Sequence, residues 1–463
     1  MISISSSGET DRHFSPGYGC RVLIAALVTA SLIVAVIVSR QLRSRQLVWD
    51  VGSSFVFVIG WAALVPVVLA KFGNQTLHTW SYWGELVEVP APVNPQVQSV
   101  IQYLILGFAV FLLWRTISDS TGRRVSIFGV AIMTSSMIAM VVDTSAWDSI
   151  IKGQPMVLLV VLAAASFGMP SREGAITGGA LFAVSVCAAG SILGVITPDD
   201  VFLPCPDKCS IAGELYMGAT PHSNTLGLIT AIGIPLVWLA FNGRTRLVML
   251  AYLVVNLLLT GSRTSMLAAA VTLAVLALTT PSVRGKTVDG KRRFLLTCTV
   301  AIVTVVAVVL PFTRQPDTFA TGRGYLWRIA LDRFEQDPFL GAGLTAWDRF
   351  YAAGEFGAAA AYSTHNQWLE VLLLSGVVGA AAFGLGYASL IFGGDDSRRF
   401  VILPVLLTIA MLSVTERPLS IGLINTMTWA LVVLVAISTD ARRDPGLAHQ
   451  SSPSSRSMSI HHQ

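Results

Sequence analysis

Residues 246–280 read RLVMLAYLVVNLLLTGSRTSMLAAAVTLAVLALTT, which is two apolar runs, 246–261 and 263–280, on either side of a short polar break. A helix that crosses the hydrocarbon core of a membrane needs roughly 20 mostly apolar residues, so each run is long enough for a short span. Gly261 interrupts the chain between the two runs. The stretch therefore predicts two membrane helices joined by a turn that carries Arg263.

The composition extends this pattern to the whole chain. Hydrophobic residues make up 53% of the 463 residues and charged residues only 12%, about half of the roughly 25% in an ordinary soluble domain. So few charges cannot solvate the surface of a soluble protein of this size, which excludes a soluble enzyme, a disordered chain and a fibrous repeat. The net charge of +5 is too small to suggest a nucleic-acid partner. We expect an all-α polytopic membrane protein in contact with membrane lipids.

Further apolar stretches predict about 12–13 transmembrane helices. The weakest stretch, 155–169, could instead be re-entrant or part of a broken helix. The candidate spans are 22–39, 51–70, 99–116, 125–142, 155–169, 175–197, 224–241, 246–261, 263–280, 294–311, 367–391, 400–415 and 419–438.

Basic residues recur at every second loop and predict the orientation, because Lys and Arg accumulate on the cytoplasmic side. The organisation that follows is an N-terminal segment at 1–21, transmembrane helices over 22–311 and 367–438, and a disordered cytoplasmic tail at 439–463. Three long segments face the outside: 71–98, 198–223 and a large, partly helical extracytoplasmic loop at 312–366. The basic clusters are Arg40 to Arg45, Arg115 to Arg124, Arg172, Arg244 and Arg246, Arg284 to Arg293, Arg398 and Arg399, and Arg442 and Arg443.

Cys205 and Cys209 lie close together in the outer segment 198–223. Disulfides form on the oxidising side of the membrane, so the two residues are candidates for a local disulfide. A zinc site would need two more ligands nearby. Asp199-Asp200 is the only outer carboxylate pair and is interpreted as a turn, so we expect no metal site.

Arg263 is the first candidate for chemistry. It lies at the start of the run 263–280, where Ser262 or Thr264 can cap a helix. The helix dipole already presents positive charge there, which disfavours a cation unless an anion joins it. Free backbone N–H groups and a guanidinium together favour a phosphate site. The alternative is an interfacial arginine whose head reaches out to water.

Arg323 repeats this pattern in the large loop, between Gly322 and Gly324. Apolar residues at helical spacing predict a short amphipathic helix over 325–337 that ends before Pro338. Arg323 would again lie at a helix start. The alternative is a helix that lies in the interface, with Arg323 and Arg328 on lipid phosphates.

His365 enters the span 367–391. Thr364 and Gln367 fit a capping box, which predicts His365 in the first helical turn. The dipole opposes protonation there, and a neutral imidazole is what a general base requires. The alternative is a polar anchor at the interface. Together, Arg263 and Arg323 would bind a diphosphate while His365 removes a proton from a hydroxyl, as glycosyl transfer from a polyprenyl-diphosphate sugar requires. A single displacement with one base predicts inversion.

Motifs in these segments resemble the O-antigen ligase and polymerase superfamily over roughly residues 210–440. The segment Pro221 to Gly227, which contains His222 and Asn224, is similar to that family's short motif before a central span. The other motifs are Gly261-Ser262-Arg263-Thr264, Gly322-Arg323 with Trp327, Pro338 and Gly341-Ala342-Gly343, and His365-Asn366 with Leu369-Glu370, Gly376 and Gly379.

The resemblance implies a GT-C-like helical fold in the bacterial plasma (inner) membrane. It implies a donor glycan linked to undecaprenyl diphosphate and a glycan or lipid-glycan acceptor, joined on the extracytoplasmic side without a metal or other cofactor. Arg263, Arg323 and His365 would be catalytic. The substrate-binding candidates are Arg328, Trp327, Asn366, Glu370, His222 and Asn224.

Two alternatives stay open. A polymerase of lipid-linked polysaccharide repeat units shares these motifs with a ligase. A polytopic transporter or lipid-linked glycan flippase should show inverted repeats or paired broken helices, and the sequence contains no internal repeat. The candidate residues and the long loop also share one face, which favours an enzyme.

Overall fold

The computed structural model describes residues 18–72, 76–80, 86–90, 95–118, 125–143, 153–168, 171–203, 209–279, 290–353, 363–394 and 396–439. Most of the predicted N-terminal segment, the predicted tail after residue 439 and Cys205 lie outside these ranges. Helices dominate the described residues, and the strands form only two short two-stranded sheets. The predicted all-α polytopic class is confirmed.

Each of the thirteen predicted apolar stretches contains a helix in the described residues. Within those residues seven helices, α1, α2, α3, α7, α8, α11 and α14, are long and apolar enough to cross a membrane, and α4, α6, α10 and α16 are shorter apolar helices. The bounds are α1 Tyr18–Arg43, α2 Val51–Phe72, α3 Pro95–Ser118, α4 Ile127–Val142, α6 Gln154–Gly168, α7 Arg172–Ile196, α8 Ser223–Ala240, α9 Gly243–Leu259, α10 Arg263–Thr279, α11 Gly290–Val309, α14 Gln367–Phe392, α15 Asp396–Ser413 and α16 Thr428–Ser438.

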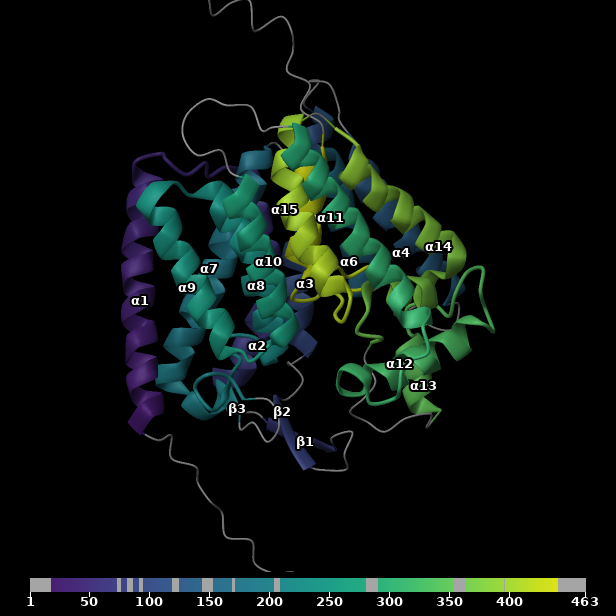
Figure 1. Ribbon diagram of the computed structural model, residues 1–463, viewed down its shortest axis with the longest axis horizontal. Helices are drawn as coiled ribbons and strands as arrows, with labels where there is room; N and C mark the ends of the chain where they lie inside the picture. Colours follow the sequence, from purple (N-terminus) through teal and green to yellow (C-terminus); the bar gives the residue numbers. More distant parts are fainter. Residues whose placement is uncertain are drawn as a thin grey trace, which may run out of the picture.

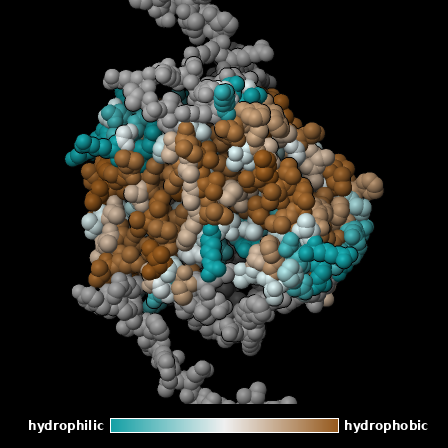
Figure 2. All heavy atoms as spheres, in the orientation of Figure 1, coloured by the Kyte–Doolittle hydropathy of each residue, from teal (hydrophilic) through white to brown (hydrophobic). Residues whose placement is uncertain are grey.

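The helices pack side by side around a continuous apolar core (Figure 1). A helix suits this setting because it satisfies its backbone hydrogen bonds internally, so apolar side chains can cover it on all sides. Trp429 at the start of α16 is fully buried and packs on Phe182 of α7 with ring centroids 5.0 Å apart. Figure 2 shows a broad hydrophobic band across the molecule, with hydrophilic groups gathered towards its two ends.

Helix α16 starts later than predicted. The span was expected from residue 419, but the helix begins at Thr428. Pro418 precedes the expected start, and the backbone N–H of Leu419 donates to Oε1 of Gln367 at 2.8 Å instead of entering a helix. The segment before α16 is thereby held against the start of α14.

The three long predicted loops contain short elements of their own. Strands β1 (Thr76–Trp80) and β2 (Leu86–Pro90) form an antiparallel hairpin in the first loop. A 3₁₀ turn at Pro198–Asp200 and strands β3 (Phe202–Leu203) and β4 (Leu215–Tyr216) lie in the second. Helices α12 (Phe319–Phe334) and α13 (Ala346–Ala352) lie in the third, at the lower end of the molecule in Figure 1.

Candidate active site

Glu416, in the loop after α15, joins two of the predicted catalytic residues. Its Oε1 forms an ion pair with Nη2 of Arg323, and its Oε2 lies 3.2 Å from Nδ1 of His365. The Arg323 and Glu416 side chains are 14% and 7% exposed, whereas that of His365 is 40% exposed. The carboxylate therefore holds a buried cation on one side and an accessible imidazole on the other.

The surroundings of Glu416 keep its carboxylate charged. Burial alone would raise its pKa, but the hydrogen bond from His365 and the electrostatic influence of Arg323, His365 and His222 more than offset burial and lower the pKa below its ordinary value. His222 therefore lies close enough to act electrostatically on Glu416. Glu416 is an anion at neutral pH.

His365 does not lie in the first helical turn, so the predicted capping box is wrong. Asn366 is the N-cap of α14, and its Oδ1 accepts hydrogen bonds from the backbone N–H groups of Trp368 and Leu369 at 3.0 and 2.9 Å. His365 precedes the cap with a φ of +51°, in the left-handed region. This backbone conformation costs a non-glycine residue about 1–3 kcal/mol, which the surrounding contacts must offset. The group that faces the imidazole is Glu416, not the helix dipole.

The amide nitrogen of Asn366 has two further partners. Nδ2 donates to the carbonyl oxygens of Ala307 on α11 at 2.9 Å and of Val414 at 3.1 Å. The side chain is fully buried, so Asn366 ties α11, the start of α14 and the Glu416 loop together. We expect it to position His365 rather than contact a substrate.

Arg323 lies just after a sharp kink in the backbone. Ala320, Thr321 and Gly322 all have positive φ, so the chain bends at the start of α12, which ends at Phe334 instead of 337. A Cβ on Gly324 would lie 2.1 Å from the Pro316 carbonyl oxygen, so only glycine allows this approach. Nη1 of Arg323 donates to Ala320 O at 3.1 Å, and Nε is a buried donor without a partner among the described residues.

Trp327 and Glu370 both hold the residue before His365. Nε1 of the buried Trp327 donates to Thr364 O at 2.9 Å, and the Thr364 N–H donates to Oε2 of Glu370 at 2.9 Å. Glu370 also accepts from Nε1 of Trp347 at 3.3 Å and from Nη1 of Arg417 at 3.0 Å. These contacts orient the chain at His365 from two sides.

Arg263 is the exposed first residue of α10, and no described residue pairs with its guanidinium. The hydroxyl oxygens of Thr264 and Thr415 are 3.0 Å apart, which brings the start of α10 against the residue next to Glu416. Arg263 therefore borders the charged cluster formed by Arg323, His365 and Glu416, as a cation that is available to a ligand.

Arg328 lies apart from the cluster in an exposed ion pair with Asp317 at 2.8 Å. His222 is the N-cap of α8, with Nδ1 accepting from the N–H of Asn224 at 3.1 Å. Of these three candidates, only His222 has a described electrostatic effect on Glu416.

Glu416 and Arg417 are candidate site residues that the sequence analysis missed. The two charged residues are adjacent in the sequence Thr415-Glu416-Arg417-Pro418, between two apolar stretches. Ionisable residues beside a span are costly and so are functional candidates. That rule, applied to this loop, could have found them.

The sequence also predicted a disulfide between Cys205 and Cys209. Cys209 is disulfide-bonded, while Cys187 and Cys298 are free. The predicted partner, Cys205, lies outside the described residues. In the described ranges no group of three His, Cys, Asp or Glu side chains could hold a metal ion.

Residues 248–384 match the family model described as O-Antigen ligase. This segment is similar to an O-antigen ligase domain. It runs from α9 into α14 and contains Arg263, Arg323 and His365, whereas Glu416 follows it. The match supports the O-antigen ligase and polymerase superfamily and confirms the predicted resemblance. No curated protein and no solved structure matches the chain.

Proposed function

We propose that this O-antigen-ligase-like protein is a membrane glycosyltransferase that moves a glycan from undecaprenyl diphosphate to an acceptor hydroxyl. The family supports a ligase or polymerase in general terms. The observation that carries the finer proposal is the contact of Glu416 with both His365 and Arg323. It supports His365 as the base and Glu416 as the carboxylate that orients it, beside Arg323, whose buried Nε has no partner among the described residues.

In this mechanism the Nδ1–H group of the neutral His365 imidazole donates a hydrogen bond to Glu416, which leaves Nε2 free to accept a proton. Nε2 removes the proton of the acceptor hydroxyl as the oxygen attacks the anomeric carbon of the donor sugar. The bond from that carbon to the diphosphate breaks, and undecaprenyl diphosphate leaves as an anion. Glu416 stabilises the imidazolium that forms, as the carboxylate of a catalytic triad does.

The two arginines would bind the leaving diphosphate as its charge develops. Arg323 contributes its unpaired Nε, and Arg263 contributes a guanidinium that has no partner in the described part of the chain. One base and one displacement lead to inversion at the anomeric carbon. We expect transfer to continue in the presence of a chelator, because arginines supply the positive charge.

Charge along the helices supports an extracytoplasmic site. Helix α9 begins with Arg244 and Arg246 and ends just before the Arg263 turn. Helix α15 contains Arg398 and Arg399 in its first turn and ends just before Glu416. The basic ends therefore lie opposite the cluster, and basic ends favour the cytoplasm.

The test is the lipid-linked glycan extracted from cells in which His365→Ala replaces the native chain. Long polymer that accumulates on the lipid would identify a ligase, because polymerisation upstream is intact. Single repeat units that accumulate would identify a polymerase. Unchanged lipid-linked glycan would overturn the glycosyltransferase proposal and favour a transporter. His461→Ala, in the C-terminal tail, is the matched control and should behave as wild type.

A further inference from the structure

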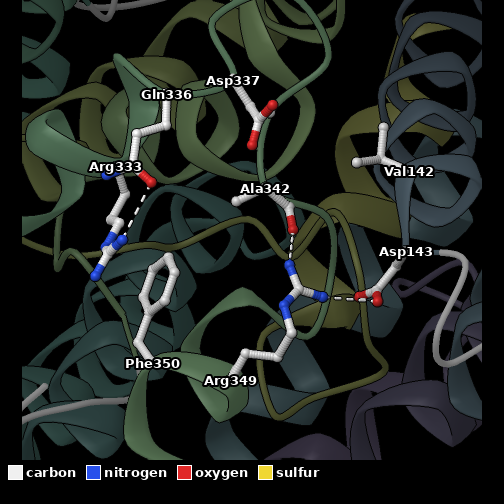
Figure 3. Close-up of a pocket in the computed structure, with 9 residues that line it drawn as sticks. Val142, Asp143, Arg333, Gln336, Asp337, Ala342, Arg349 and Phe350 are labelled. Carbon is white, nitrogen blue, oxygen red and sulfur yellow. Dashed lines mark hydrogen bonds and ion pairs between the residues drawn. The ribbon is translucent and has the colours of Figure 1, made fainter. Parts of the chain in front are cut away.

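A polar cavity of about 490 Å³ lies between the end of α4 and the segment that joins α12 to α13 (Figure 3). Its volume falls within the range of roughly 300–1,000 Å³ for small-molecule sites. None of the residues Arg263, Arg323 and His365 lines this cavity. The lining residues are Val142, Asp143, Arg333, Gln336, Asp337, Gly341, Ala342, Arg349 and Phe350.

The lining combines donors and acceptors in balanced numbers. Two arginines, Arg333 and Arg349, stand against two carboxylates, Asp143 and Asp337, and Gln336 adds an amide that both donates and accepts. This balance differs from a diphosphate site, which would be predominantly cationic. Hydroxyl groups, which donate and accept at once, fit such a lining.

The cation on the α13 side is held rigidly. Buried Asp143 accepts from Nη1 of Arg349 at 2.8 Å and from the N–H and hydroxyl of Thr345, both at 2.6 Å. Arg349 also donates to the carbonyl oxygen of Ala342. A guanidinium has five N–H donors, so Arg349 keeps donors for a ligand, and its side chain is 43% exposed. Figure 3 shows it between Asp143 and Phe350.

The opposite wall comes from α12 and the residues that follow it. Arg333 lies over the ring of Phe350, with its guanidinium carbon 5.3 Å from the centroid, and donates to Oε1 of Gln336 at 3.1 Å. The Asp337 carboxylate is exposed, and no described residue donates a hydrogen bond to it. Phe350 is buried beneath Arg333 and supports this wall, so the polar groups at the surface of the cavity are the ones that can bind hydroxyls.

The segment that lines the cavity is hydrogen-bonded to α14, the helix that follows His365. The N–H groups of Ala342 and Gly343 donate to the carbonyl oxygens of Leu373 and Leu374 on α14, at 2.7 and 3.0 Å. Trp347 of α13 donates to Glu370 at 3.3 Å, and Glu370 holds Thr364. A ligand in the cavity would therefore have a defined position relative to His365.

We infer that this cavity is a carbohydrate-binding subsite that takes a sugar unit of the donor or acceptor glycan. The inference rests on the proposed function for its link to catalysis, but the sugar-binding chemistry belongs to the cavity itself. A subsite away from the reacting bond would select which glycan is used and hold it while His365 acts.

The test uses the full-length protein with the double variant Gln336→Ala/Asp337→Asn. Both side chains are exposed, so the fold should be retained, and gel filtration checks this. The variant removes the side-chain amide of Gln336 and the negative charge of Asp337, so we expect KM for one glycan to rise about 5- to 50-fold while kcat stays near wild type. The control is Asp348→Asn, an exposed residue of α13 that does not line the cavity.

Direct binding separates donor from acceptor and does not need transfer. The probes are the delipidated donor glycan and the delipidated acceptor glycan, each measured against wild type and variants by saturation-transfer NMR. Loss of contact with one probe in the double variant, but not in Asp348→Asn, would support the subsite and name its ligand.

The subsite and the proposed function can fail independently. Unchanged KM values and unchanged NMR contacts for both glycans would overturn the subsite, even if His365→Ala abolishes transfer. If the wild type transfers no glycan, the proposed function fails, and the NMR comparison alone decides the subsite.

Discussion

Nδ1 of His365 lies 3.2 Å from Oε2 of Glu416, although 51 positions separate the two residues. Helix α14 carries the chain away from His365, and α15 brings it back to Glu416. The same carboxylate pairs with Arg323, 93 positions earlier. The packing of membrane helices thus builds one charged cluster from three distant segments.

Replacing Glu416 with glutamine should reduce turnover. Glu416→Gln keeps the shape but removes the charge that orients His365 and stabilises its imidazolium. We expect kcat to fall about 100- to 1,000-fold in a purified donor–acceptor assay, within the range for general acid–base contributions. Glu416→Asp should recover part of this loss. The control is Glu335→Gln, a change of an exposed residue at the end of α12, which should have no effect. A wild-type kcat in Glu416→Gln would refute the orienting role.

Acid should destabilise the wild type through Glu416. Because the pKa of Glu416 is lower in the folded state than its ordinary 4.5, the unfolded chain takes up this proton first as the pH falls. The stabilising contribution is therefore complete above about pH 4.5 and is lost as the pH falls through the folded-state pKa. We expect the thermal unfolding midpoint to fall less below pH 4.5 in Glu416→Gln than in wild type. Parallel curves would contradict the lowered pKa; Glu335→Gln serves as the reference.

Arg263→Lys should weaken donor binding without changing stability. The residue is exposed and has no partner in the described residues, so the fold does not depend on it. Lysine keeps the charge but cannot form two parallel hydrogen bonds to a phosphate. We expect the donor KM to rise about 10-fold or more, since hydrogen bonds to charged groups contribute roughly 1.5–3 kcal/mol. Arg314→Lys, also exposed, should match wild type, and equal donor kinetics in the two variants would refute diphosphate binding at Arg263.

Asn366→Ala should destabilise the fold. It removes the cap of α14 and leaves the carbonyl oxygens of buried Ala307 and half-buried Val414 without this donor. We expect a loss of about 2–4 kcal/mol in the free energy of unfolding, measured by denaturation in detergent. Asn242→Ala is the matched control, because Asn242 is the exposed N-cap of α9 and makes no capping hydrogen bond. A similar loss in both variants would show that the ties of Asn366 do not stabilise the protein.

The apolar pattern of the sequence was sufficient to locate the membrane helices, apart from the start of α16. A chain inside a membrane must satisfy its backbone hydrogen bonds within each segment, so the pattern that predicts a span also predicts a helix. Arg263, Arg323 and His365 were visible for a related reason. Each lies where an apolar or amphipathic run begins, and a charged or polar group there is conspicuous in a sequence with few charges.

The partners of these residues depended on tertiary structure. The capping box at Thr364 was a reasonable local prediction, yet Asn366 became the cap because its side chain also reaches Ala307 and Val414 on other elements. Glu416 could pair with His365 and Arg323 only after three segments had packed together. Local sequence determined where each helix forms, since its hydrogen bonds are local. The cluster at Glu416 was decided by helix packing, because its contacts span 51 and 93 positions along the chain.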